Sequence, residues 1–166
     1  SLFFLRYLLV IFSISIVFFL SIPNFFDYEK KKREDAIKIS LQKSYGLQLS
    51  EKGKINYNFF PVPHLEIVNA ISKFENEKIK LNSKKIKIYP KLKNIYNYKN
   101  FKIKKIKLHK SELIIDQKNF KNFLKNISIL KKKILFEDLF VKILDNKNSI
   151  IEFKKVKYTN YGIKKN

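Results

Sequence analysis

The first part of the chain constrains its fold most strongly, because it is almost entirely apolar. The run from Leu2 to Ile22 spans 21 residues and carries one charged side chain, Arg6. An α-helix rises about 1.5 Å per residue, so roughly 20 residues cross a hydrocarbon layer about 30 Å thick. Arg6 lies near one end, where its long side chain can reach the lipid headgroups. The run therefore predicts an uncleaved transmembrane anchor.

Two other interpretations of this run fit less well. A cleaved signal peptide has an apolar core of about 7–15 residues and a small-residue cleavage site, but this run is longer and ends in Ser21-Ile22-Pro23-Asn24. A buried helix of a globular domain is rarely apolar on every face. We assign residues 1–26 to the anchor and expect further residues before Ser1. Its predicted bilayer residues are Leu8, Leu9, Ile11, Phe12, Ile16, Phe18, Phe19 and Leu20.

The positive charge of the chain is a weak guide to its partner. Lys and Arg number 36 against 14 Asp and Glu, a net charge of +22, but only two of these residues are Arg. Phe, Ile, Lys, Asn and Tyr make 99 of the 166 residues, and these are the amino acids with A/T-only codons. The lysine excess can therefore reflect genome composition. Arg is preferred for bidentate phosphate contacts, so we expect no nucleic-acid partner, and anionic lipid headgroups suit lysines beside a membrane better.

Nothing in the sequence marks an enzyme. There is no Cys, which excludes disulfides, Cys-ligated metals and thiol catalysis. His64 and His109 are the only histidines, and neither belongs to a catalytic or metal-binding motif. We predict no catalytic residue, no metal site and no cofactor.

A helix is predicted directly after the anchor. Ala36, Ile37, Leu41 and Tyr45 recur at helical spacing, and Gly46 stands where a helix C-terminus favours a positive φ. We interpret residues 27–46 as an amphipathic linker helix that leads out of the membrane. A lipid-binding amphipathic helix is the alternative.

From residue 47 onward the apolar residues alternate with polar ones. This pattern predicts antiparallel strands with one apolar and one polar face. Residues 145–148 are predicted to join the last two strands as a hairpin loop, and residues 90–98 and 119–127 to form short helices or turns. The predicted fold class is α+β, with a transmembrane helix and a short amphipathic helix before a β-rich, groove-like sheet over residues 47–166.

The order of these features resembles the start of AsmA-like proteins of Gram-negative bacteria. The residues that carry the resemblance follow the single span: Ser44-Tyr45-Gly46, Gly53-Lys54-Ile55-Asn56-Tyr57, and Phe60-Pro61-Val62-Pro63-His64-Leu65-Glu66-Ile67. It covers roughly residues 2–125. Val68-Asn69 departs from the family pattern, and such proteins are commonly several times longer, so we expect a fragment of a longer protein.

The resemblance implies a bacterial inner-membrane protein with a periplasmic body related to bridge-like lipid transfer proteins. It further implies an apolar β groove that binds or conducts phospholipid for the outer envelope. The predicted groove residues are Ile55, Tyr57, Phe59, Leu65, Ile67, Ile86, Ile88, Ile103 and Leu108. An ordinary closed core is the alternative for these residues. For the whole protein, the alternative is a membrane-tethered scaffold that binds other envelope proteins and does not transfer lipid.

Overall fold

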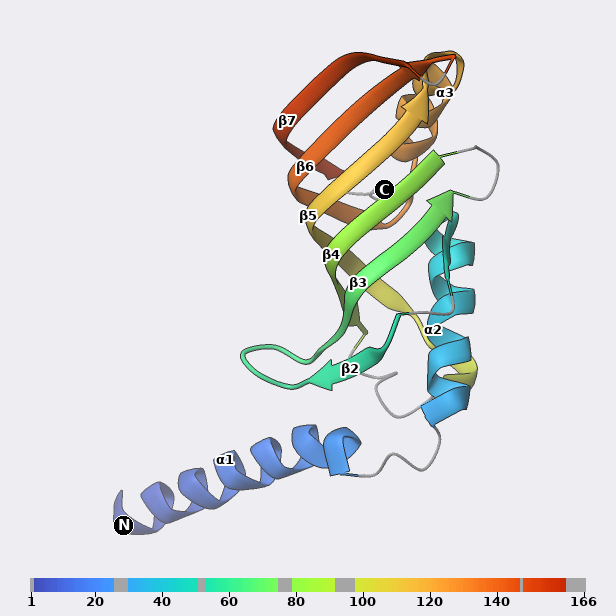
Figure 1. Ribbon diagram of the computed structural model, residues 1–166. Helices are drawn as coiled ribbons and strands as arrows, with labels where there is room; N and C mark the ends of the chain where they lie inside the picture. Colours follow the sequence, from blue (N-terminus) through green and yellow to red (C-terminus); the bar gives the residue numbers. More distant parts are fainter. Residues whose placement is uncertain are drawn as a thin grey trace.

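The computed structural model describes residues 2–25, 30–50, 53–74, 79–91, 98–146 and 148–160. Along the chain its elements are α1 (Leu2–Phe25), α2 (Lys30–Tyr45), β1 (Leu47–Leu49), β2 (Ile55–Asn58), β3 (His64–Phe74), β4 (Ile79–Pro90), the 3₁₀ turn η2 (Tyr98–Asn100), β5 (Ile103–Asp116), α3 (Gln117–Ser128), β6 (Lys133–Asp145) and β7 (Asn148–Asn160). Figure 1 shows a curved sheet with α2 and α3 beside it and α1 projecting from its lower end. The predicted α+β class is confirmed.

The seven strands of the described chain form one sheet in the order β1-β3-β4-β5-β6-β7, and β2 also pairs with β3. β1 and β2 pair with opposite ends of β3. Every pair is antiparallel except β5 with β6, which is parallel. The prediction of antiparallel strands throughout is therefore wrong at this pair. Parallel neighbours need a crossover, and α3 provides it: the helix spans the predicted helix-or-turn region 119–127 and extends slightly beyond both ends.

The two faces of the sheet differ in polarity, as the alternation predicted. One face packs with α2 and α3 into a single apolar core. The other face carries charged pairs between neighbouring strands. Their nitrogen–oxygen distances are 3.1 Å for Lys85–Glu66, 3.6 Å for Lys107–Glu137, 2.8 Å for His109–Glu137 and 3.1 Å for Lys142–Glu112.

The long strands are bent where single residues adopt a left-handed backbone. Asn69, Lys110, Asp138 and Lys155 have φ values of 52°, 47°, 60° and 55°. Three of them lie at one level of the sheet, where the strand pairing is interrupted between Val68 and Ala70, between His109 and Ser111 and between Glu137 and Leu139 without a change of register. Between β6 and β7 the register does shift between Phe136 and Val141, where Asp138 lies, and such a β-bulge bends its strand and increases the local twist. Figure 1 accordingly shows β5, β6 and β7 curving back on themselves.

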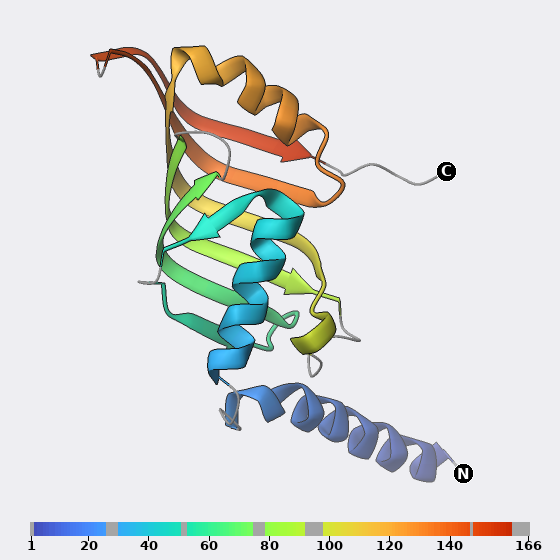
Figure 2. The same ribbon diagram turned by 90° about the vertical axis from the view of Figure 1, so that its right-hand side faces the viewer.

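Helix α2 packs against the sheet. The side chains of Ile37 and Leu41 are 0% exposed, and the Tyr45 hydroxyl donates a hydrogen bond to the Lys133 carbonyl at 3.2 Å. Gly46 ends the helix with φ 65°, as predicted, and its N–H bonds the Gln42 carbonyl at 2.8 Å. Figure 2 shows α2 lying across the strands. The apolar stripe of the amphipathic helix predicted for residues 27–46 thus belongs to the core.

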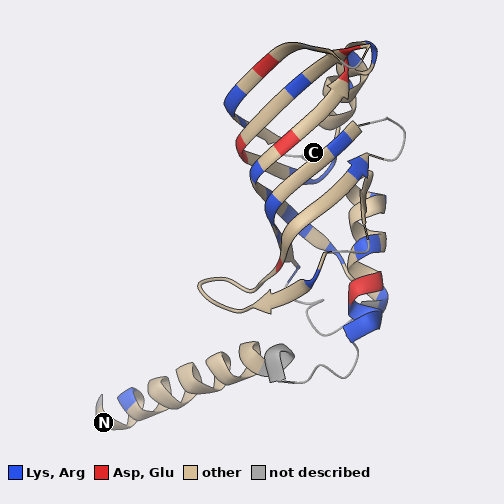
Figure 3. Ribbon diagram, viewed as in Figure 1, with Lys and Arg blue, Asp and Glu red and all other residues tan. Residues whose placement is uncertain are grey.

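Helix α1 contains a segment, Phe3–Ser21, that is long and apolar enough to cross a membrane, and none of it is buried in the fold. Figure 3 shows it without charge except near its start. It touches the body near its end, where the Tyr57 hydroxyl donates a hydrogen bond to the Leu20 carbonyl at 2.9 Å. Helix α1 therefore meets the sheet at β2.

Candidate functional site

The residues predicted to line a groove lie together on the apolar face of the sheet. Phe59 is partly buried and packs against the core. The other eight expose between 0% and 8% of their surface: Ile55, Tyr57, Leu65, Ile67, Ile86, Ile88, Ile103 and Leu108. These eight side chains are buried in the core, so an acyl chain can reach them only if the core opens. The predicted anchor residues all lie on α1, and all but the half-buried Leu20 are exposed.

The apolar face opens at the edge strand β7. Phe153 pairs with the buried Val141, and Ile151 pairs with the buried Ile143, so each pair shares one face of the sheet. Yet Ile151 is 42% exposed and Phe153 is 45% exposed. Here the face continues beyond the closed core.

A separate cleft of about 1130 Å³ lies between α2 and the segments that lead into β5 and β6. Six of the 13 described residues that line it are lysines, compared with 34 lysines among all 166 residues. The lysine fraction of the cleft lining is therefore about twice that of the whole chain. The lysines are Lys32, Lys43, Lys91, Lys99, Lys102 and Lys132. We call this feature the lysine cleft.

Backbone and side-chain hydrogen bonds fix the shape of the lysine cleft. The Lys91 N–H donates to the Lys102 carbonyl at 2.9 Å and so brings these two residues together. The buried Ser40 hydroxyl donates to the Phe101 carbonyl at 3.4 Å and ties α2 to the same segment. Phe101 and Ile103 give the cleft a buried apolar wall. The cleft thus combines a cationic rim with an apolar wall, as an amphiphile requires.

The electrostatics of this end of the molecule favour an anion. Asp35 is the one carboxylate among the described residues that line the cleft. Nearby, the pKa of Lys105 is lowered by burial and by the charges of Lys107, Lys133 and Lys104. Burial is the largest cause of this shift, and repulsion by the three neighbouring lysine charges adds to it. A bound anion would relieve this repulsion.

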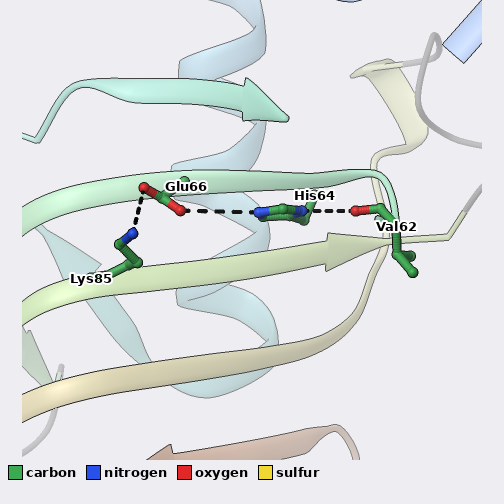
Figure 4. A network of polar contacts seen from close by, with 4 residues as sticks. All are labelled: Val62, His64, Glu66 and Lys85. Carbon is green, nitrogen blue, oxygen red and sulfur yellow. Dashed lines mark hydrogen bonds and ion pairs between the residues drawn. The ribbon is translucent and has the colours of Figure 1, made fainter. Parts of the chain in front are cut away.

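A second feature without a predicted role is the 59–63 loop between β2 and β3. Phe60 is 78% exposed and Val62 is 53% exposed at its tip. His64 Nδ1 donates a hydrogen bond to the Val62 carbonyl at 2.7 Å. The imidazole ring of His64 stacks on the ring of Tyr89, with 5.5 Å between the ring centroids. Figure 4 shows the chain of contacts from Val62 through His64 and Glu66 to Lys85. His64 therefore holds the end of the loop.

The second histidine lies on the polar face of the sheet. His109 Nδ1 is 2.8 Å from a Glu137 oxygen. Burial lowers the pKa of His109, and Lys87, Lys107 and Lys85 lower it further, whereas Glu137 raises it. Among the described residues, no three His, Cys, Asp or Glu side chains gather as metal ligands.

Sequence reasoning missed both the lysine cleft and the 59–63 loop. The cleft lysines come from four separated segments, so no sequence spacing marks them. The loop did carry a signal, because residues 55–65 contain no Asp, Glu, Lys or Arg in a chain that is 30% charged. A scan against models of known protein families finds no match, and a search of curated proteins finds none either.

Proposed function

We propose that this chain is a single-pass anchored protein that binds anionic phospholipid, with the phosphate in the lysine cleft. This proposal rests on the cleft itself, in which six lysines and an apolar wall lie beside α2. Each lysine near a membrane surface adds about 1 kcal/mol of attraction for anionic lipid. An ammonium group also binds phosphate without strict geometry.

The AsmA-like resemblance adds to this proposal the place in the cell where the protein would act. In that setting α1 lies in the bacterial inner membrane, the body lies in the periplasm, and the bound phospholipid serves outer-envelope lipid homeostasis. The predicted groove then supplies a path for acyl chains, which opens when α2 lifts from the sheet. Support comes from the apolar face that continues to the exposed Ile151 and Phe153 at β7.

The test is the amount of phospholipid that co-purifies with the full chain in mild detergent, read by mass spectrometry. We expect bound anionic phospholipid, and a several-fold loss in the triple variant Lys91→Gln, Lys99→Gln, Lys102→Gln. The control carries Lys73→Gln, Lys80→Gln and Lys121→Gln, three exposed lysines outside the cleft. Each variant removes three charges, so general electrostatic attraction falls equally in both.

Two results would contradict the proposal. Equal loss in both triple variants would mean that net charge, and not the cleft, holds the lipid. A wild-type chain without phospholipid would favour a tether for envelope proteins. A photocrosslinker at Ile39, an exposed cleft residue, should form lipid adducts, whereas one at the fully buried Ile88 forms them only if the groove opens.

A further inference from the structure

The 59–63 loop is apolar, exposed and placed next to the anchor. Its tip residues Phe60 and Val62 are 78% and 53% exposed. Single exposed apolar residues are common on protein surfaces, but this pair lies within residues 55–65, which lack charged side chains in a chain that is 30% charged. The composition of the loop therefore departs from that of the rest of the surface.

The position of the loop relative to α1 indicates what its apolar composition is for. In Figures 1 and 2 the segment between β2 and β3 projects in the same direction as α1. Its base is fixed to the anchor, because the Tyr57 hydroxyl bonds the Leu20 carbonyl at 2.9 Å. Leu20 is close to the end of the candidate span Phe3–Ser21. A bilayer around α1 would thus meet the loop at its headgroup level.

The backbone of the loop is also suited to a poorly hydrated environment. Unpaired N–H and C=O groups are costly there. Pro61 and Pro63 have no N–H to satisfy, and the Val62 carbonyl already accepts a hydrogen bond from His64 Nδ1. Prolines and the buried His64 further limit the conformations of the loop, so its insertion would lose little conformational freedom.

We propose that the 59–63 loop is a second membrane contact, which inserts Phe60 and Val62 at the headgroup–acyl boundary of the leaflet where α1 ends. Aromatic and apolar side chains are favoured at this depth. Two contacts, α1 and the loop, fix the orientation of the body relative to the bilayer. The inference rests on the single-pass anchor of the proposed function, but it does not require lipid in the lysine cleft.

The test uses the full chain in phosphatidylcholine nanodiscs with single spin labels, because the chain has no native Cys. Labels at Val62→Cys, at Ile16→Cys within α1 and at Asn122→Cys on the exposed side of α3 are compared. Collisions with oxygen report lipid, and collisions with a nickel chelate report water. We expect Val62 to resemble Ile16, and Asn122 to collide mainly with nickel.

Two further variants separate insertion from damage to the loop. In the Val62→Cys background, Phe60→Asp should lower the oxygen-to-nickel ratio on the order of tenfold, because a charge is expelled from lipid, whereas Phe60→Leu should preserve it. Equal loss with both variants would overturn the inference.

The label positions also distinguish failure of the loop from failure of the anchor. Val62 in water with Ile16 in lipid would overturn the inference and leave the anchor intact. Val62 shielded from both reagents would mean that protein covers the loop, which also refutes it. Ile16 in water would refute the anchor, and the inference with it.

Discussion

His109 shows how the surroundings of one residue set its titration. It lies between Lys85 on β4 and Glu137 on β6 in the register of the sheet, and Lys87 and Lys107 also face it. The direct contact with Glu137 alone would raise its pKa, but burial is the larger effect, so the pKa of His109 in the folded protein lies below its usual value. The unfolded chain then binds a proton more readily than the folded one.

A pH dependence of stability follows from this shift. The contribution of neutral His109 is fully present above about pH 6.5 and is lost as the pH falls through the lower folded-state pKa. We expect the free energy of unfolding to decrease as the pH falls below about 6.5, and His109→Gln to flatten that decrease. Denaturant unfolding of both chains in mild detergent measures the difference. Parallel curves for the two chains would contradict the assignment.

At the scale of elements, the left-handed residue in the middle of β5 is the feature with the clearest energetic consequence. Lys110 has φ 47°, and a left-handed backbone costs a residue with a Cβ about 1–2 kcal/mol. Glycine removes that cost but loses about 0.5–1 kcal/mol through its freedom in the unfolded chain. We therefore expect Lys110→Gly to raise the free energy of unfolding by about 0.5 kcal/mol.

The matched control for this substitution lies on the same strand. Lys104 is an exposed residue of β5 and is not among the residues with a positive φ. Lys104→Gly should therefore lower the free energy of unfolding by about 0.5–1 kcal/mol, because glycine adds freedom to the unfolded chain and relieves no strain here. Thermal or denaturant unfolding compares the two variants. If both substitutions destabilise the chain equally, the bend at Lys110 does not depend on the left-handed residue.

The elements also show which features a sequence can predict. Helix α2, its end at Gly46 and the β6–β7 hairpin were predictable, because period and turn chemistry are local signals. The parallel β5–β6 pair was not, since alternation fixes the faces of a strand and not the direction of its neighbour. The left-handed positions Lys110 and Asp138 lack the glycine that usually marks a positive φ. The lysine cleft depends on distant segments that only the fold brings together.

At the scale of the whole molecule, the apolar helix α1 meets the sheet at β2. The sheet itself has one polar face and one apolar core face. The hydrogen bond from Tyr57 to Leu20 makes this junction. The basic residues at positions 30–33, which follow α1, are partly built into the folded body. Arg33 is buried, with 7% of its surface exposed, and Lys32 lines the lysine cleft. Two of these four charges thus belong to the folded body, which weakens their use as an orientation signal.

The orientation of the anchor can therefore be predicted against the simple charge rule. The positive-inside rule would place residues 30–33 in the cytoplasm, but it has little force for a long domain that crosses the membrane as a whole. We expect the body in the periplasm, as the AsmA-like resemblance implies. Because the chain has no Cys, Asn122→Cys on α3 should react with a membrane-impermeant maleimide once the outer membrane is opened. Ser15→Cys, within the span, should stay unreacted as the control. Labelling of Asn122→Cys only after lysis of the inner membrane would place the body in the cytoplasm, where it could not serve the outer envelope.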